Sequence, residues 1–443
     1  MSDWARLPLT SFAASEPNAF VDGPFGSDLK VSDYTDAGYR ILQLQNVGDG
    51  CFLDDNTKFT TEHKALSLSR CLVRPGDLLI AKMSDPLARA CIVPPEFSKG
   101  LIVADLIKLR PHAFTDKDFL CAAINAPVFR REANRLSTGT TRTRISLSTL
   151  KRIALDAPGL SDQQRIGEIA RIIDEAIDQT EALIAKTQQI KAGLMHDLFT
   201  RGVTKNGELR PPHSEAPQLY KESPLGWIPK EWELAHLASK RAPNRAHLKT
   251  GPFGSALKLE HWVEQGRPVI TIGALGEGQF IESELLHVSD KTAERLCEYQ
   301  LEVGDVVFSR VADVGRSAVI NEPQEGWIMS SNLMRISLDL HEVNPAYLQA
   351  QLAYDPRVRR QIRARLNAGG RDVANSQTLN RLGFAWPPYG EQECVVARLA
   401  GIEDLLQVER AYASTLCAQK MGLMHDLLTG RVRVPTNASS TPA

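Results

Sequence analysis

The chain has 443 residues, of which 43% are hydrophobic and 24% are charged, with 52 basic and 53 acidic side chains. This composition excludes a disordered or fibrous protein, and the length is enough for about three domains. Because the formal net charge is −1, overall basicity gives no argument for nucleic-acid binding, which would have to depend on local clusters of positive charge.

The N-terminal residues and the cysteines predict a cytoplasmic protein. No apolar signal-peptide region follows Met1, and no uncharged apolar run approaches the roughly 18 residues needed to cross a bilayer. The seven cysteines are scattered, without a Cys-x-x-Cys pair or a histidine at ligand spacing. We therefore expect reduced thiols and neither disulfides nor structural zinc.

The chain carries the same pattern twice. The run Gly23-Pro24-Phe25-Gly26-Ser27 returns 228 positions later as Gly251-Pro252-Phe253-Gly254-Ser255. The same offset aligns Trp4 with Trp232, Gly76-Asp77 with Gly304-Asp305, and Lys82 with Arg310. Further along, an offset of 229 aligns Arg130-Arg131 with Arg359-Arg360, Arg142 with Arg371, and Leu194-Met195-His196-Asp197-Leu198 with Leu423-Met424-His425-Asp426-Leu427. A repeat of about 200 residues is far longer than a solenoid unit and indicates a duplicated pair of domains.

Each copy divides into a mixed domain and a long helix. In residues 1–158 and 225–387, short β-type runs such as 78–81 and 306–308 follow Gly-Asp turns and alternate with helical patches, which predicts α+β domains. Residues 159–200 and 388–430 are predicted to be long helices, because apolar residues recur there at steps of three and four. Between and after them, 201–224 is rich in proline and glycine and predicts a flexible linker, and 431–443 a flexible tail.

The apolar stripes of the two helices predict a coiled-coil seam. Its positions are Ile166, Ile169, Ile173, Leu183, Ile190 and Leu194 in the first helix, and Val395, Ile402, Leu405, Tyr412, Leu416 and Leu423 in the second. About 38 residues at about 1.5 Å each give a rod roughly 57 Å long, which is too long to bury its stripe inside a small domain. We therefore expect the two helices to pair antiparallel, as in a two-fold dimer. The alternatives are a long helix packed on its own domain and a coiled coil between two chains.

Positive charge is concentrated just before each long helix. Residues 130–152 carry seven Arg or Lys against one acid, and residues 357–381 carry seven Arg against one acid, Asp372. Two equivalent cationic surfaces on a rigid spacer suit double-stranded DNA, which carries about one charge per 1.7 Å. The alternative is a solvated helix face, because Arg357, Arg360 and Arg363 have helical spacing.

The repeated glycine motifs have a chemical and a structural interpretation. The glycines of Gly-Pro-Phe-Gly-Ser would let backbone N–H groups approach a phosphate or a base edge; alternatively, the run is a structural turn with a buried phenylalanine. The pair Gly76-Asp77 followed by Lys82 resembles the spacing of nuclease residues, as does its repeat. No second acid completes a metal site, so we interpret the pair as a turn that opens a strand.

Two other motifs resemble enzyme sites without their full chemistry. His196-Asp197 and its repeat are similar to the metal-binding pairs of phosphohydrolases, but adjacent helical residues point about 100° apart, which favours helix-end packing. The run Trp386-Pro387-Pro388-Tyr389 is similar to the Asn/Asp-Pro-Pro-Tyr motif of amino-methyltransferases. Tryptophan cannot accept a hydrogen bond from a target amine, so we do not expect methyl transfer by this chain.

The order of these features resembles a known family. Duplicated α+β domains, each opened by a Gly-Pro-Phe-Gly-Ser run, alternate with long helices that close in Leu-Met-His-Asp-Leu. Residues 225–232, read as LGWIPKEW, are similar to the segment that opens the recognition domains of that family, whereas the first copy keeps only Trp4 of it. Over nearly the whole chain, this organisation resembles the specificity subunit of type I restriction-modification enzymes.

The resemblance implies an α+β fold with two pseudo-symmetric globular target recognition domains, separated by two long antiparallel coiled-coil helices. It implies a non-catalytic subunit whose domains each read one half of a split double-stranded DNA sequence. The helices would dock two methyltransferase subunits, and nuclease-translocase subunits would join for cleavage. No cofactor is then expected in this chain, because S-adenosylmethionine would belong to the methyltransferase and ATP and magnesium to the translocase.

Within the recognition domains we expect basic residues to contact DNA. Phosphate contacts are assigned to Arg130, Arg131, Arg359 and Arg360. Base contacts are assigned to Arg142, Arg144, Arg371, Lys30 and Lys258, with Lys82 and Arg310 as further DNA-binding residues. The alternatives are a stand-alone DNA methyltransferase or nuclease, and a structural coiled-coil adaptor.

Overall fold

The computed structural model describes residues 4–24, 28–55, 57–83, 86–139, 143–253, 256–311, 313–367 and 373–434. The chain forms two compact units: unit 1 comprises Met1–Leu183 with Glu409–Ala443, and unit 2 comprises Ile184–Val408. Each unit contains one mixed domain and a part of each long helix, α5 (Leu160–Thr200) and α10 (Tyr389–Leu428). No helix in the described ranges is long and apolar enough to cross a membrane.

The domain of unit 1 contains two sheets and one strand pair. One sheet is antiparallel with the order β2-β10-β7-β8, and the other has the order β3-β5-β4-β9-β6 and one parallel pair, β4 with β9. The pair β1 and β11 joins the two ends of the domain. The strands are β1 (Ala5–Pro8), β2 (Phe20–Asp22), β3 (Tyr34–Thr35), β4 (Tyr39–Leu42), β5 (Lys58–Thr60), β6 (Leu72–Val73), β7 (Leu78–Ala81), β8 (Ala90–Ile92), β9 (Gly100–Ile102), β10 (Leu106–Leu109) and β11 (Ala154–Ala157).

Short helices of unit 1 begin at capping residues. Thr61, Asp116 and Ser146 each accept a hydrogen bond from the backbone N–H three residues on, and so satisfy a free donor of the first turn. The helices are α1 (Glu62–Ser67), α2 (Lys117–Asn125), α3 (Pro127–Arg135) and α4 (Leu147–Leu150).

Unit 2 repeats this domain with the same strand order, except that among the described residues its second sheet has four strands, without a strand equivalent to β6. Its antiparallel sheet is β15-β22-β19-β20, its second sheet is β16-β18-β17-β21, and β14 pairs with β23 as β1 does with β11. The strands are β12 (Tyr220–Lys221), β13 (Ile228–Pro229), β14 (Glu233–His236), β15 (Leu248–Thr250), β16 (Trp262–Val263), β17 (Arg267–Ile270), β18 (Leu286–Val288), β19 (Val306–Ser309), β20 (Ser317–Val319), β21 (Ile328–Met329), β22 (Leu333–Ile336) and β23 (Gly383–Trp386). The helices are α6 (Asp290–Arg295), α7 (Pro345–Tyr354), α8 (Pro356–Asn367) and α9 (Ser376–Asn380).

A central strand in each domain is apolar because both of its faces are covered. In β7, Leu78 and Ile80 belong to one hydrophobic core and Leu79 to another. In β19, Val306 and Phe308 likewise belong to one core and Val307 to another. Successive side chains of a strand point to opposite faces, so these apolar runs serve two cores at once.

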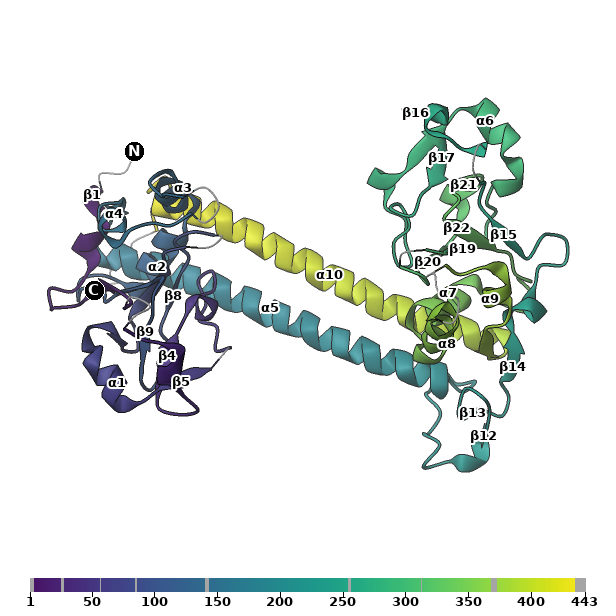
Figure 1. Cartoon of the computed structure of the whole chain (residues 1–443), viewed down its shortest axis with the longest axis horizontal. Helices are drawn as coiled ribbons and strands as arrows, with labels where there is room; N and C mark the ends of the chain where they lie inside the picture. Colours follow the sequence, from purple (N-terminus) through teal and green to yellow (C-terminus); the bar gives the residue numbers. More distant parts are fainter. Residues whose placement is uncertain are drawn as a thin grey trace, which may run out of the picture. The chain divides into compact units, whose positions relative to one another are not determined.

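In each unit, a segment of α5 lies beside a segment of α10 (Figure 1). In unit 1, Ile166 shares a core with Leu427, and Asp174 forms an ion pair with Lys420. In unit 2, Phe199 shares a core with Val395, and Lys191 pairs with Glu403. In both units the residue numbers rise on one helix as they fall on the other, so the segments are antiparallel.

These contacts repeat at the offset of 229. Asp174 corresponds to Glu403 and Lys420 to Lys191, so the duplicated sequence makes the same ion pair once in each unit. The repeated Leu-Met-His-Asp-Leu motif supplies apolar residues to a domain core in each unit, through Leu198 in one and Leu427 in the other. The motif therefore serves helix-end packing.

Five of the predicted seam positions are wrong. The exposed fractions of Leu183, Ile190, Leu405, Tyr412 and Leu423 are 49%, 53%, 48%, 56% and 44%. The neighbouring residues Leu406 and Met424 are buried in place of Leu405 and Leu423, and Thr180, Thr187 and Glu409 are also buried. Apolar residues outnumber the inward positions of these helices, so periodicity alone cannot choose between two stripes one residue apart. The remaining seven positions, Ile166, Ile169, Ile173, Leu194, Val395, Ile402 and Leu416, are buried or half-buried.

Residues 201–224 are ordered, in contrast to the predicted flexible linker. Strand β12 pairs with β13, and the hydroxyl of Tyr220 donates to the carbonyl of Pro211 at 2.6 Å. Arg210 is buried against Glu391 in the first turn of α10, with Nη2 2.9 Å from Oε2. Proline and glycine exclude long regular elements here but not fixed turns. The predicted tail, 431–443, lies outside the described residues from residue 435 onwards.

Candidate nucleic-acid interface

Three segments of the first domain meet at the end of β7. The backbone N–H of Gly23 donates to Leu106 O at 2.9 Å, and that of Lys82 donates to Asp105 O at 2.8 Å. The N–H of Ile145 donates to Lys82 O at 2.9 Å. We call the residues Asp22, Gly23, Lys82, Asp105 and Arg144 loop site 1. The contacts connect Gly23, the first residue of the repeated glycine run, through Asp105 and Leu106 to a predicted DNA-binding lysine, and that lysine to the segment of Arg144.

The second domain repeats this framework. Gly251 N–H donates to Leu333 O at 3.1 Å, Arg310 N–H donates to Asn332 O at 3.0 Å, and Ala374 N–H donates to Arg310 O at 2.9 Å. These contacts define loop site 2, which comprises Thr250, Gly251, Phe253, Arg310, Asn332 and Ala374. The repeated backbone hydrogen bonds place Lys82 and Arg310 at equivalent points of the two domains.

The first glycine of each run permits a close backbone crossing. A Cβ atom at Gly23 would lie 2.0 Å from Val103 O, and one at Gly251 would lie 2.0 Å from Ser330 O. A side chain at either position would therefore collide with the backbone of a neighbouring loop, so glycine is required there for the fold and not only for a ligand. Phe253 is 64% exposed, so the interpretation as a turn with a buried phenylalanine is wrong for the second copy. Phe25 lies outside the described residues.

Gly23→Ala and Gly251→Ala are each expected to destabilise their own unit by about 1–3 kcal/mol, because the backbone must shift to admit a methyl group. Native-state hydrogen exchange of the full chain measures the effect in each unit separately. Gly159→Ala and Gly390→Ala are the controls, since no atom lies within 4 Å of the added Cβ at either position. Unchanged protection of both units in the two loop variants would contradict the steric argument.

Carboxylates neutralise the cations of loop site 1. Lys82 Nζ lies 3.0 Å from Asp22 Oδ2, and Arg70 approaches the same carboxylate at 3.8 Å. Arg144 forms an ion pair with Asp105. The sequence indicated the cations but not these counter-ions, because Asp22 and Asp105 lie 60 and 39 residues from their partners in the chain.

The predicted phosphate-binding arginines also have internal partners. Arg130 is bound to Asp49 by two hydrogen bonds of 2.5 and 2.9 Å. In the second copy, Arg359 lies 3.6 Å from Glu277, which occupies the position equivalent to Asp49. Each ion pair ties a loop to the helix that carries the arginine. The adjacent Arg131 and Arg360 are exposed.

The remaining predicted base-reading residues are two exposed lysines and two arginines. Lys30 and Lys258 are exposed, and Lys258 Nζ is 3.7 Å from Glu260 Oε1. Arg142 and Arg371 lie outside the described residues.

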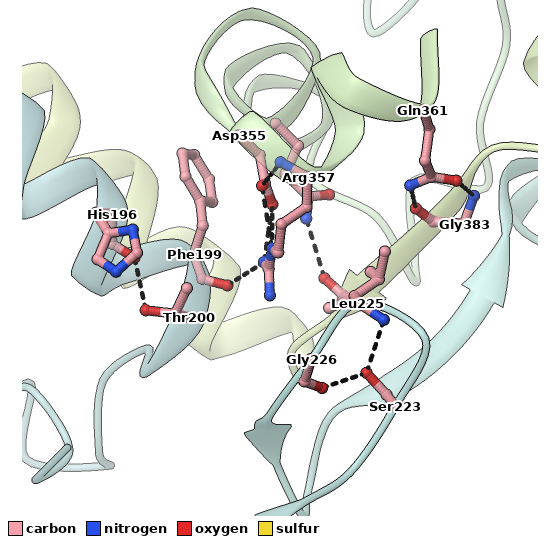
Figure 2. Close-up of polar contacts among 12 residues, drawn as sticks. His196, Phe199, Thr200, Ser223, Leu225, Gly226, Asp355, Arg357, Gln361 and Gly383 are labelled. Atoms are coloured by element: carbon pink, nitrogen blue, oxygen red, sulfur yellow. Dashed lines mark hydrogen bonds and ion pairs between the residues drawn. The ribbon is translucent and has the colours of Figure 1, made fainter. Parts of the chain in front are cut away.

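Arg357, the first residue of the second basic cluster, has a structural role (Figure 2). Its guanidinium binds Asp355, with Nη2 2.8 Å from Oδ2, and donates to Phe199 O near the C-terminus of α5. Gln361 of the same helix pairs with both backbone groups of Gly383 in β23, at 2.8 and 3.0 Å. These side chains join α8 to its surroundings, so the basic cluster is not a uniform cationic surface.

The Gly-Asp turns are structural, as predicted. Asp77 is buried and binds Arg110 through both carboxylate oxygens, at 2.7 and 2.8 Å. Asp305 is buried and accepts hydrogen bonds from Ser337 at 2.6 Å and Arg245 at 2.7 Å. Among the residues that the structure describes, no three His, Cys, Asp or Glu side chains are grouped as metal ligands.

The geometry defines a class of protein: a duplicated α+β chain with two equivalent loop sites and two long antiparallel helices. No family model matches the chain. In sequence it is 22% identical to the MjaX specificity subunit of a type I restriction enzyme from Methanocaldococcus jannaschii, over 90% of this chain and 88% of that protein. It is 20% identical to the MjaVIII specificity subunit of the same organism, over 76% of this chain and 75% of that protein.

Solved structures show the same fold. The S subunit of the type I restriction-modification system from M. genitalium covers 96% of both chains at a TM-score of 0.57 and 13% identity. A chain from the complex assembly of a type I R-M system covers 97% of this chain and 98% of its own, with a TM-score of 0.57 and 15% identity. The chain is thus a relative of the type I restriction enzyme specificity subunits and has their fold.

Proposed function

We propose that this chain is the DNA-binding specificity subunit of a type I restriction-modification complex. Each domain reads one half of a split double-stranded sequence, and α5 and α10 set the spacing between the halves. The proposal rests above all on the repeated loop site, because a site duplicated with its backbone hydrogen bonds suits a ligand that offers two similar half-sites.

The basic residues divide into two classes of contact in this proposal. Phosphates are held by Arg130, Arg131, Arg359 and Arg360. The exposed Arg131 and Arg360 can contact a phosphate while the neighbouring Arg130 and Arg359 keep their ion pairs with Asp49 and Glu277. Base edges are read from the loops by Arg142, Arg144, Arg371, Lys30 and Lys258. Arg144 must exchange Asp105 for DNA.

The long helices dock the partner subunits. In unit 1, Ile172 and Leu183 of α5 are exposed and lie eleven residues apart, about three helical turns, so they share one face. Tyr412 and Leu423 of α10 have the same spacing and are also exposed. Such apolar faces favour protein partners, and two methyltransferase subunits and the nuclease-translocase subunits are the partners proposed.

Catalysis belongs to those partners. S-adenosylmethionine binds to the methyltransferase, and ATP and magnesium bind to the translocase, while this chain supplies the sequence preference. Methylation of an adenine requires the base to leave the helical stack, a step that we assign to the methyltransferase pocket.

The test is a genome-wide map of methylated adenines in cells with and without this chain. We expect a two-part motif that disappears with the chain. Exchanging residues 1–158 with 225–387 should exchange the halves of the motif. Methyl transfer by the purified chain alone, or a methylation pattern independent of it, would refute the proposal.

A further inference from the structure

The two loop sites share a backbone framework but differ in charge. In loop site 1, Asp22 neutralises Lys82 at 3.0 Å. In loop site 2, the position of the aspartate is occupied by Thr250 and that of the lysine by Arg310. The carboxylate is lost, but the cation is kept.

The second carboxylate of loop site 1 is lost as well. Asp105, which pairs with Arg144, corresponds to Asn332 in the framework of backbone hydrogen bonds, and Arg144 corresponds to Val373. Among the described residues, loop site 2 therefore has one cation, Arg310, where loop site 1 has two ion pairs.

Arg310 is held in place by groups that do not neutralise it. Its Nε donates to Ala374 O at 3.1 Å, its Nη1 donates to Ser331 O at 3.3 Å, and its guanidinium lies over the ring of Phe253 at 5.7 Å. Among the described residues, which do not include Asp372, no carboxylate forms an ion pair with it. Partial burial lowers the pKa of its guanidinium.

Such an arginine is prepared for a ligand with negative potential. A cation that is partly removed from water without a counter-ion gains more from an external acceptor than one already paired. Two carbonyls and a ring fix the plane of the guanidinium, and a flat donor group of fixed orientation suits the O6 and N7 acceptors of guanine better than a phosphate on a mobile backbone.

We propose that Arg310 reads a guanine in the half-site bound by the second domain, and that Phe253 is its positioning residue. This inference rests on the proposed function, because it names the base contact of one recognition domain. It predicts that the preference for one guanine depends on a single side chain that is absent from the equivalent site of the first domain.

The test uses the complex of the full chain with its methyltransferase subunits and a library of double-stranded DNA with randomised positions. The wild-type complex should select a two-part motif with a guanine in the second half-site. Arg310→Ala should lower the preference for that guanine about 10- to 100-fold and leave the first half-site unchanged. Arg310→Lys should lower it by less, because an ammonium can still contact guanine but lacks the planar fork that the two carbonyls and the ring orient. Phe253→Ala should lower the preference for guanine less, because the carbonyls of Ser331 and Ala374 still orient the Arg310 guanidinium.

Lys82→Ala is the matched control, since it changes the equivalent residue of loop site 1 and should leave the second half-site unchanged. Arg310→Lys keeps the charge and decides the test if Arg310→Ala fails to assemble. An unchanged motif in the lysine variant overturns the inference, as does equal weakening of all sequences with a shallower salt dependence, which marks a phosphate contact. Absence of any selected sequence with the wild-type complex would instead refute the proposed function.

Discussion

Arg210→Ala is expected to destabilise the contact between residues 201–232 and the start of α10 by about 3–5 kcal/mol, the usual cost of removing one partner of a buried ion pair. The side chains of Arg210 and Glu391 are each only 8% exposed. Glu391 also accepts hydrogen bonds from Val203 N–H at 2.9 Å and from Trp232 Nε1 at 3.2 Å. Without the arginine, a buried carboxylate would keep only neutral donors.

Native-state hydrogen exchange of the full chain measures this effect, because unfolding of a protein with two units is not expected to be two-state. Amides of residues 201–232 should lose protection by at least about 100-fold, while those of unit 1 keep theirs. Lys205→Ala is the control, since Lys205 lies in the same segment and is exposed. Equal protection in the two variants would show that the pair contributes nothing.

Asp77→Asn and Asp305→Asn are expected to destabilise units 1 and 2 respectively, each by about 2–3 kcal/mol, because a buried charged acceptor of several hydrogen bonds is lost. The side chains of Asp77 and Asp305 are 2% and 3% exposed, whereas their arginine partners are partly buried and keep a second carboxylate, Glu16 and Glu302. Amides of β7 should lose protection from hydrogen exchange only in the first variant, and those of β19 only in the second.

The exposed residues Asp36 and Glu264 supply the controls, as Asp36→Asn and Glu264→Gln. The variants Asp77→Asn and Asp305→Asn also test the interpretation of the Gly-Asp motif. If either substitution removed a nuclease activity of the purified chain and left hydrogen exchange unchanged, the aspartate would be a functional group and its structural role would be wrong.

The candidate site was predictable as separate parts. The repeat marked Gly23 and Gly251, and it aligned Lys82 with Arg310. What brings the parts together is hydrogen bonding between loops that are distant in the chain, such as Ile145 N–H to Lys82 O at 2.9 Å. Comparison of the copies shows that Thr250 stands where the first copy has Asp22. The sequence alone does not show that Asp22 pairs with Lys82, so it could not show what this difference means for Arg310.

Duplication, domain class and the presence of two long helices follow from the order of residues, because these features depend on local pattern. Capping residues, Gly-Asp turns and apolar runs determine the structure of residues a few positions away in the chain, and each signal occurs in both copies. The inward stripe of α5 and α10, the partner of each buried charge and the ordered state of residues 201–224 required the folded chain. Coulombic and packing energies depend on distance in space, and a pair such as Arg210 and Glu391 is separated by 181 residues of sequence.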